Sequence, residues 1–274
     1  MIHSEFEDIT VEELKQLIES TKEKNYMLVD VRQPTEYEGG HIPGAKFIPL
    51  NDLVSDFSGL PQNKDLIFYC HSGGRSLAAS SMASEEMVTD KKIYNLTGGI
   101  LAWEGKTLKG FPKIHVFDKD KETIDLLITA MDLEKGAWRF YVHILDNFDI
   151  GPITSTLEDL SKAEIGHAKT VYGFWKTVAG TIRPFEELYA DLNGEILEGG
   201  ERLTDMLDFL EKIKENQCLY ILETALHIEY AAFDLYRTMA ENIKDPTAQD
   251  TFLTIAQAEK NHMRMLTRAL DLCD

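Results

Sequence analysis

The stretch DLIFYCHSGGRSLAAS, residues 65–80, has the pattern of a buried strand, a glycine-containing turn and the start of a helix. The apolar run ends at Cys70, and the helical pattern begins at Arg75. Open α/β sheets place their sites at the carboxyl ends of strands. Gly73 and Gly74 allow a tight turn in which several N–H groups point into the loop and bind an anion. The pattern therefore predicts a functional site around Cys70.

Three hypotheses apply to this cysteine: a buried core thiol, a phosphatase nucleophile and a sulfur carrier. The helix start and Arg75 add positive potential, which favours a reactive thiolate over a buried, inert thiol. Cysteine-dependent phosphatases place one more residue between Cys and Arg than the four that separate Cys70 from Arg75. The smaller loop favours a terminal persulfide sulfur over a phosphoryl group.

The same alternation of short β-rich runs and helical patterns covers the first 110 residues. Thr10 and Glu13 form a capping box at the start of a helix. Strands are predicted at 26–31, 45–50, 65–70 and 92–96, and helices at 10–20, 75–87 and from 98 onward. Alternating strands and helices predict a parallel α/β sheet covered on both faces.

Residues 1–110 resemble a rhodanese domain through three separated motifs in that family's order. The motifs are LVDVRQPTEYEGGHIPGAKFIPL (28–50), YCHSGGRS (69–76) and LTGGILAW (96–103). The resemblance implies a sulfurtransferase in which Cys70 takes sulfane sulfur from a small donor as a persulfide. It then passes that sulfur to a thiol or a cyanide-like acceptor.

The resemblance also assigns roles to individual residues. Arg75 is expected to help hold an anionic donor, and Asp30 and Arg32 match the family's Asp-x-Arg signature. We expect Asp30 and Arg32 to be mainly structural, and the same holds for His41. The amides that would hold the persulfide belong to His71, Ser72, Gly73, Gly74 and Arg75.

After residue 121 the pattern changes to long helical segments. They are predicted at 122–148, 155–180, 202–243 and 247–272. Ser155 and Glu158 form a candidate capping box for the second segment, and Pro246 marks the start of the fourth. Short links within each pair and one long link between the pairs predict a four-helix bundle with one crossover. The predicted domains are residues 1–114 and 115–274.

The helical half contains an internal repeat. Glu134 and Tyr141 are followed by the pair Glu164 and His167 in a Glu-x-x-His pattern. All four residue types return 95 positions later as Glu229, Tyr236, Glu259 and His262. One common offset for a whole set indicates two related helix hairpins.

The repeated residues suit a dinuclear metal site. Each glutamate lies in an apolar helical stretch, where an unpaired carboxylate is costly to bury. One Glu from each of two helices and a Glu-x-x-His from each of the others form the ligand set of dinuclear carboxylate bundles. Oxygen and imidazole ligands favour two iron ions, or manganese, over metals that prefer thiolate. Tyr141 and Tyr236 share the faces of Glu134 and Glu229, and we expect them to hydrogen-bond the ligands.

Residues 122–272 resemble a rubrerythrin-type ferritin-like domain. The resemblance implies Glu164 and Glu259 as bridging ligands, with His167 and His262 as terminal ligands. It implies reduction of peroxide or reaction with dioxygen, and a homodimer formed through the bundle. Two departures are visible: Leu226 and Ala232 occupy the places of that family's extra carboxylate, and no Cys-x-x-Cys pair is present. An external electron donor is therefore expected.

Composition limits the partners and the location. The net charge of the 274-residue chain is −19, of which residues 116–274 carry −14, so nucleic acid and anionic membranes are not expected partners. No apolar run reaches membrane-spanning length, and the acidic start has no signal-peptide pattern. Cys218 and Cys273 are scattered and predicted to be without partners. We expect a reduced, cytoplasmic protein.

Two functions remain open on the sequence alone. The first is a persulfide-forming sulfurtransferase fused to a di-iron oxidase or peroxidase. The second is a non-catalytic protein that binds iron, or senses oxidant or sulfide, and carries a rhodanese module.

Overall fold

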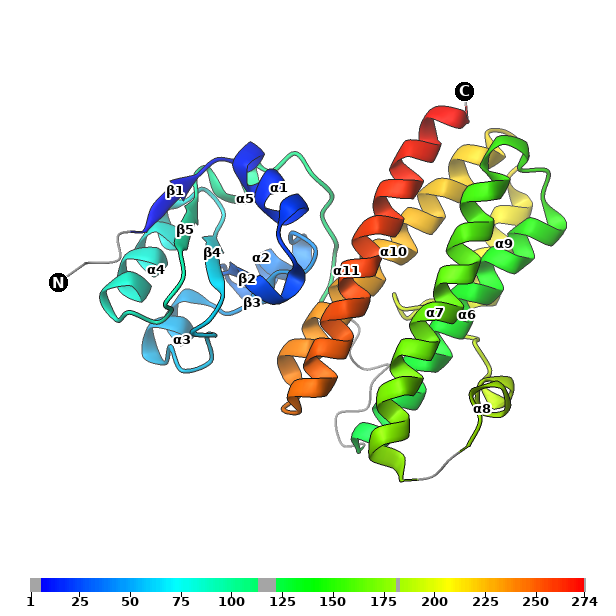
Figure 1. Cartoon of the computed structure of the whole chain (residues 1–274). Coiled ribbons are helices and arrows are strands. Elements are labelled where there is room, and N and C mark those ends of the chain that lie inside the picture. Colours follow the sequence, from blue (N-terminus) through cyan, green and yellow to red (C-terminus); the bar gives the residue numbers. More distant parts are fainter. Residues whose placement is uncertain (1–5, 113–121, 181–182, 274) are drawn as a thin grey trace. The chain divides into compact units, whose positions relative to one another are not determined.

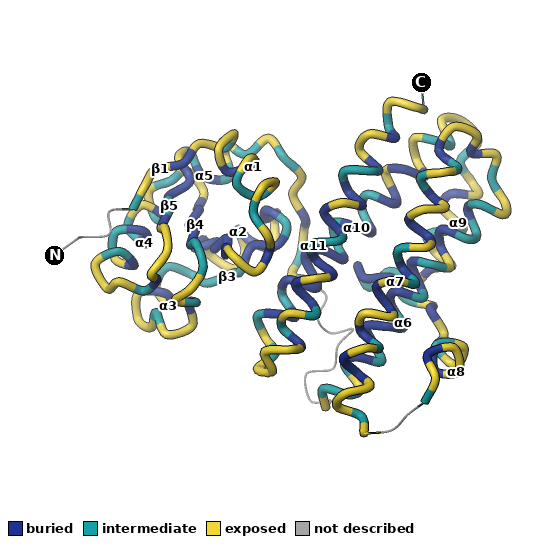
Figure 2. Tube along the Cα trace, in the orientation of Figure 1, coloured by how far each residue is buried: buried dark blue, intermediate teal, exposed yellow. Residues whose placement is uncertain are grey.

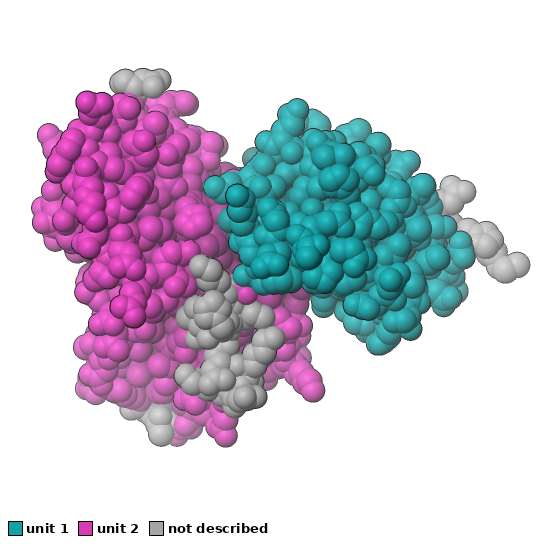
Figure 3. All heavy atoms as spheres, turned by 180° about the vertical axis from the view of Figure 1, so that it is seen from behind, with its two compact units in different colours: residues 1–111 teal, residues 112–274 magenta. Residues whose placement is uncertain are grey.

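The computed structural model describes residues 6–112, 122–180 and 183–273. The chain divides into two compact units, Met1–Phe111 and Pro112–Asp274 (Figures 1 and 3). The predicted domain boundary between residues 114 and 115 lies outside the described residues.

A parallel sheet forms the centre of the first unit. Within its described residues five strands lie in the order β1-β5-β4-β2-β3, and all of the pairs are parallel. The strands are β1 (Glu7–Ile9), β2 (Tyr26–Asp30), β3 (Lys46–Phe47), β4 (Asp65–Tyr69) and β5 (Ile93–Leu96). The predicted α/β class is confirmed. The sequence pattern did not reveal β1. The segment 45–50 forms only two strand residues, because Pro49 has no N–H and a helix begins directly after it, at Leu50.

Helices cover both faces of the sheet (Figure 1). They are α1 (Val11–Ser20), η1 (Glu23–Asn25), α2 (Pro34–Gly39), α3 (Leu50–Ser55), α4 (Gly74–Glu85) and α5 (Gly99–Ala102). Phe68 of β4 packs with Ala79 of α4, whereas its neighbour Ile67 packs on the other face with Leu14 of α1. This alternation buries both faces of β4 from Leu66 to Tyr69, and most of the strand is dark in Figure 2. The capping box of Thr10 and Glu13 is confirmed.

Four long helices form the second unit. They are α6 (Thr123–Asn147), α7 (Thr154–Ala179), α10 (Gln217–Asn242) and α11 (Pro246–Ala269), with the short turns η3 (Gly151–Ile153) and η4 (Leu270–Leu272). The crossover from α7 to α10 carries α8 (Phe185–Asp191) and α9 (Leu203–Lys212). The predicted helix over 202–243 is therefore two helices, because the chain turns at Asn216 with a φ of +52°.

The two helix starts predicted in this half have different outcomes. The capping box of Ser155 and Glu158 is wrong, because α7 already begins at Thr154 and Ser155 lies inside its first turn. The start at Pro246 is confirmed, and the side chain of Asp245 accepts hydrogen bonds from the backbone N–H groups of Thr247 and Ala248.

The core of the bundle consists of two apolar clusters with the predicted ligands between them along each helix. On α6, Met131 belongs to one cluster and Phe140 to the other, and Glu134 lies between them. On α11 the order is the same, with Ala256 of the first cluster before Glu259 and His262 and with Leu266 of the second cluster after them. The polar side chains thus occupy a layer that apolar side chains close at both ends.

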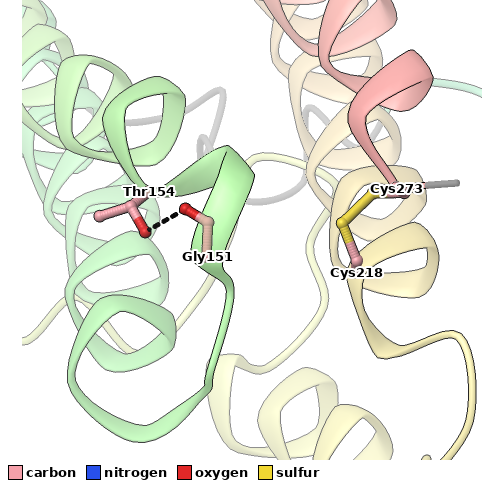
Figure 4. The surroundings of a disulfide bond; sticks show 4 residues. All are labelled: Gly151, Thr154, Cys218 and Cys273. Atoms are coloured by element: carbon pink, nitrogen blue, oxygen red, sulfur yellow. Dashed lines mark hydrogen bonds between the residues drawn. A yellow bond between two sulfur atoms is a disulfide. The ribbon is translucent and has the colours of Figure 1, made fainter.

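A disulfide joins Cys218, near the start of α10, to Cys273, after the end of η4 (Figure 4). The prediction that these two cysteines have no partner is wrong, and so is the prediction of a fully reduced chain. The two helices are of similar length and pack as a hairpin, so residues 55 positions apart meet at the open end of that hairpin. Among the described residues no helix is long and apolar enough to cross a bilayer.

Candidate functional sites

Cys70 directly follows β4 and faces the first turn of α4. Its side chain continues the row of Leu66 and Phe68 on one face of the strand. The sequence argued against a buried thiol, but Cys70 is buried and only 1% exposed. The surroundings of the sulfur atom therefore decide whether the thiol is inert.

Polar hydrogen atoms surround the Cys70 sulfur. The Gly73 N–H donates to Sγ over 3.1 Å, and the Ser76 hydroxyl lies 3.6 Å from it. Burial raises the pKa of the thiol, but hydrogen bonds from the Ser76 hydroxyl and from the amides of Ser76, Gly73 and Ser72 more than offset this, and the pKa is lowered. The arrangement stabilises a thiolate inside the loop.

Of the loop amides predicted from the sequence, those of Ser72 and Gly73 bond the sulfur. Gly73 precedes α4 with a φ of +104°, and Gly74 is the first residue of that helix. A residue with a Cβ would be strained at Gly73. His71 and Ser72 are exposed, and Ser72 bonds the sulfur through its amide.

A second turn fixes the start of the cysteine loop. The N–H groups of Ile100 and Leu101 donate to the carbonyl oxygens of Cys70 and His71 over 2.8 and 3.1 Å. Gly99 has a φ of +59°, and a Cβ there would lie 2.4 Å from the Cys70 carbonyl oxygen. The glycines of LTGGILAW therefore allow this turn to approach the cysteine loop.

Arg75 is paired with a carboxylate that the sequence pattern did not single out. Its Nη1 and Nη2 donate to Oε2 and Oε1 of Glu36, each over 2.7 Å. The hydrogen bond from Arg75 is the main reason that the pKa of Glu36 is lowered to about 2. Glu36 also accepts from the Gln33 N–H at the start of α2. The sequence shows Glu36 at the capping position of a helix, but this position gives no information about a partner 39 residues away.

Asp30 and Arg32 form a buried ion pair at the end of β2. Arg32 donates through Nε to Asp30 Oδ1 over 2.9 Å, and through Nη2 to the Gly40 carbonyl over 2.7 Å. His41, the next residue, is buried and stacks on Tyr37 at 3.9 Å between ring centroids. This geometry ties the strand end to the turn at residue 40 and fits a structural role.

The helical unit brings all six predicted metal ligands into its polar layer. Each is buried, and each helix contributes at least one of Glu134, Glu164, His167, Glu229, Glu259 and His262. One candidate ligand atom from each of Glu164, His167, Glu259 and His262 lies within 4.8 Å of the other three. Two Glu-x-x-His pairs 95 residues apart thus meet in space.

The His167 ring contacts three carboxylates through one nitrogen. Its Nδ1 lies 3.2 Å from Glu134, 3.3 Å from Glu164 and 3.1 Å from Glu259. These surroundings suit an imidazole that shares a metal ion with the carboxylates, and they also suit a protonated imidazole that donates to them.

The His262 ring repeats this arrangement in the second hairpin. Its Nδ1 lies 3.0 Å from Glu229, 3.6 Å from Glu164 and 3.0 Å from Glu259, and the two imidazoles stack at 4.9 Å. Glu164 and Glu259 therefore contact both imidazoles, whereas Glu134 and Glu229 contact one each. This is the pattern expected of two bridging and two terminal carboxylates.

Several ligand atoms in this layer have no hydrogen-bond partner. The buried ligand atoms without a hydrogen bond are Glu134 Oε2, Glu164 Oε1, His167 Nδ1 and Glu259 Oε2, although each lies 3.0 to 3.6 Å from an oppositely charged group of the layer. Burial raises the pKa of Glu229 to about 7. Burial alone would lower the pKa of His262, but the charges of Glu229 and Glu259 raise it to about 11. The buried carboxylates and imidazoles of this layer favour a positive charge between them, as two divalent cations would supply.

The two tyrosines of the repeat bond the ligands of the opposite hairpin. The Tyr141 hydroxyl, from α6, donates to Glu229 Oε1 of α10. The Tyr236 hydroxyl, from α10, donates to Glu134 Oε1 of α6. Tyrosine and glutamate seven residues apart were predicted to share a face, and the structure adds that each tyrosine reaches across the bundle.

Comparison with known proteins places both units in families. Residues 10–106 match the model of the rhodanese-like domain, and residues 220–273 match the rubrerythrin model. The putative sulfurtransferase YtwF of Bacillus subtilis is 35% identical over 103 residues, which cover 38% of this chain and 95% of YtwF. This chain belongs to the rhodanese family. Its rhodanese domain is fused to a rubrerythrin-type domain, as both resemblances predicted.

Two further relatives match the rhodanese domain alone. A sulfurtransferase of Allochromatium vinosum is 34% identical over 96 residues, which cover 35% of this chain and 86% of that protein. The putative sulfur carrier protein YrkF of B. subtilis is 37% identical over 105 residues, which cover 38% of this chain. The chain spans 54% of the length of YrkF.

The rubrerythrin match covers α10 and α11, which carry the second half of the repeat. The first half, with Glu134, Glu164 and His167, lies outside the matched residues. The common offset and the contacts of His167 connect it to the same centre. In the rubrerythrin-type domain, Glu198 and Asp234 are also buried. The sequence pattern did not single them out, because neither has a counterpart in the repeat.

Proposed function

We propose that the rhodanese domain is a sulfurtransferase that carries sulfane sulfur on Cys70. The ring of hydrogen-bond donors around Sγ is the observation that supports this proposal. The thiolate attacks the outer sulfur of thiosulfate, a new S–S bond forms, and sulfite leaves with the electron pair of the broken bond. A thiolate or cyanide acceptor then bonds the outer sulfur, and Cys70 departs as thiolate.

Arg75 beside the loop supplies positive charge for an anionic donor, which Glu36 partly offsets. Arg75 is held by two hydrogen bonds to Glu36, which leave its other N–H groups for a further anion. Glu36 raises the pKa of Arg75 most, and the charge of the Cys70 sulfur raises it as well. Arg75 in this position favours both the thiolate and an approaching thiosulfate.

A single substitution tests the sulfur transfer. Cys70→Ser keeps the shape of the loop but cannot form a persulfide, so we expect thiocyanate formation from thiosulfate and cyanide to fall to background. The mass of the wild-type protein should rise by one sulfur atom after thiosulfate treatment, and that of the variant should not. The matched control is the double variant Cys218→Ser, Cys273→Ser, which should keep the activity. Equal activity of wild type and Cys70→Ser would rule out the proposal.

We also propose that the rubrerythrin-type domain holds two iron ions, with manganese as the alternative metal. The contact of Glu164 and Glu259 with both imidazoles is the observation that supports it. The four carboxylates of the repeat would balance the charge of two divalent ions, and the two histidines would bind one ion each.

The reaction proposed for this centre is reduction of hydrogen peroxide, or of dioxygen, by electrons from an external donor. Peroxide takes up two electrons and two protons and gives two molecules of water. The bound metal would supply the electrons. Tyr141 and Tyr236 hold the terminal carboxylates in place, and the apolar clusters on both sides keep bulk water out of the layer.

Metal analysis of protein purified without oxygen tests the second proposal. We expect about two iron ions per chain in the wild type, as in dinuclear carboxylate bundles, and a lower content in Glu164→Gln. Peroxide should then be consumed when a reductant is supplied. A chain that binds the metal but consumes neither peroxide nor dioxygen would support the non-catalytic, sensing alternative. A homodimer and a cytoplasmic location stay predictions, which size-exclusion chromatography and cell fractionation would check.

A further inference from the structure

The crossover of the rubrerythrin-type domain contains a tight hairpin between α8 and α9. Ile196 and Arg202 form an antiparallel bridge, and the Gly200 N–H donates to the Leu197 carbonyl over 2.7 Å. Glu198 is therefore the second residue of a four-residue turn. Turn tips are usually exposed to solvent, but Glu198 is 2% exposed. The hairpin thus carries a carboxylate inward.

The hairpin packs directly against α6, close to the ligand Glu134. Gly136 lies against it, and a Cβ at that position would be 2.4 Å from the Ile196 carbonyl oxygen. Gly194 has a φ of +57°, and a Cβ there would lie 2.9 Å from the Lys135 carbonyl carbon. Backbones this close leave little freedom for the turn to move relative to the ligand layer.

Polar side chains of α6 hold the segment before the hairpin. Asp132 Oδ1 accepts from the N–H groups of Asn193 and Gly194 over 2.7 and 2.9 Å. Arg139 Nη1 donates to the Asn193 carbonyl over 2.6 Å. Lys135 Nζ donates to the carbonyls of Tyr189, Ala190 and Leu192. The crossover is therefore anchored along the stretch of α6 that carries Glu134.

One oxygen of the buried Glu198 carboxyl group has no hydrogen-bond partner. This oxygen, Oε2, is buried and makes no hydrogen bond, as is true of one carboxylate oxygen each of Glu134, Glu164 and Glu259. Burial raises the pKa of Glu198 well above the ordinary value, and the charges of these same three carboxylates raise it further. A carboxyl group enclosed among these charges must either be protonated or be neutralised by a cation shared among them.

We propose that Glu198 is a further carboxylate ligand of the dinuclear centre, delivered by the crossover and not by one of the four long helices. The assignment rests on the dinuclear centre proposed above. A fifth carboxylate exceeds the charge of two divalent ions, and it offsets part of the added positive charge when the ions are oxidised. Glu198 therefore stabilises the bound metal most in the oxidised state.

Glu198→Gln tests this assignment, because glutamine keeps the shape of the side chain and loses the charge. The matched control is Glu195→Gln, an exposed position on the same hairpin. Anaerobic Fe(II) binding is measured by competition with a chelator, and iron retention is measured again after oxidation. We expect at least about a tenfold loss of affinity in Glu198→Gln, a larger loss of iron after oxidation, and no change in Glu195→Gln.

Thermal unfolding of the metal-free proteins separates a ligand from a structural residue. A ligand that repels its neighbours when no metal is bound should leave the midpoint of Glu198→Gln unchanged or higher than that of wild type. Equal iron affinity in wild type and Glu198→Gln would overturn the assignment. If the metal-free midpoint of the variant is also lower, Glu198 has a structural role instead. If wild type binds no iron, the dinuclear centre itself is refuted, and the role of Glu198 with it.

Discussion

The Tyr141 hydroxyl donates to Glu229 although the two residues come from different halves of the repeat. The symmetry-related bond runs from Tyr236 to Glu134. Each of these two carboxylates is thus held by the hairpin that does not contain it. Neither hairpin alone therefore contains a complete set of ligands with their supporting hydrogen bonds.

Tyr141→Phe should weaken metal binding without removing a ligand. The change leaves Glu229 Oε1 without its donor, and loss of a group that orients a metal ligand typically costs about 10- to 100-fold in affinity. Tyr236→Phe should have a similar effect through Glu134. Chelator competition with Fe(II) measures both.

The matched control for the tyrosine variants is Tyr172→Phe, whose hydroxyl donates to the Arg183 carbonyl over 2.6 Å and touches no ligand. That variant should bind iron like wild type. Unchanged affinity in both Tyr141→Phe and Tyr236→Phe would show that these hydrogen bonds do not support the metal.

Ser76→Ala should raise the pKa of the Cys70 thiol. The thiol pKa lies below its ordinary value because hydrogen bonds from Ser76 and the loop amides outweigh the effect of burial. Without the hydroxyl, fewer hydrogen bonds oppose the effect of burial, so the pKa rises and the neutral thiol is favoured. The rate of alkylation by iodoacetamide, followed against pH, should therefore show its midpoint at a higher pH.

Ser81→Ala is the control for the alkylation profile, because that hydroxyl bonds Glu85 on the outer side of α4. Its midpoint should match that of wild type. A Ser76→Ala midpoint at or below the wild-type value would contradict the role assigned to the hydroxyl.

Gly99→Ala should disturb the cysteine loop from outside it. The new Cβ would lie 2.4 Å from the Cys70 carbonyl oxygen and 2.7 Å from that of His71, and the backbone is in the left-handed region. We expect a loss of about 2 kcal/mol or more in the free energy of unfolding of the rhodanese domain, together with reduced sulfur transfer. Urea unfolding and the thiocyanate assay measure the two effects.

The control for Gly99→Ala is Gly39→Ala, where a Cβ meets no atom within 4 Å. It should leave both measurements near their wild-type values. If Gly99→Ala were as stable and as active as Gly39→Ala, the close approach of the two turns would contribute to neither stability nor sulfur transfer.

Most of both sites was predictable because each leaves a pattern in the sequence. The cysteine loop is local, with its glycines and Arg75 within six residues of Cys70, and the ligands repeat at a fixed offset. Glu36 and Glu198 had no such pattern. Glu36 meets Arg75 only through the packing of α2 near the loop, and Glu198 reaches the ligand layer only because the crossover folds against α6. Their positions depend on tertiary contacts that neither spacing nor periodicity contains.

The Cys218–Cys273 disulfide should stabilise the rubrerythrin-type domain and leave the rhodanese domain unaffected. The bond closes a loop of 55 residues, and loop-closure entropy for that length corresponds to up to about 4 kcal/mol. A reductant should therefore lower the thermal midpoint of wild type but not that of the double variant Cys218→Ser, Cys273→Ser. Cys70→Ser, which keeps the disulfide, should respond to reductant as wild type does. Midpoints that are the same with and without reductant would show that the bond contributes nothing, and would again favour the reduced chain expected from the scattered cysteines.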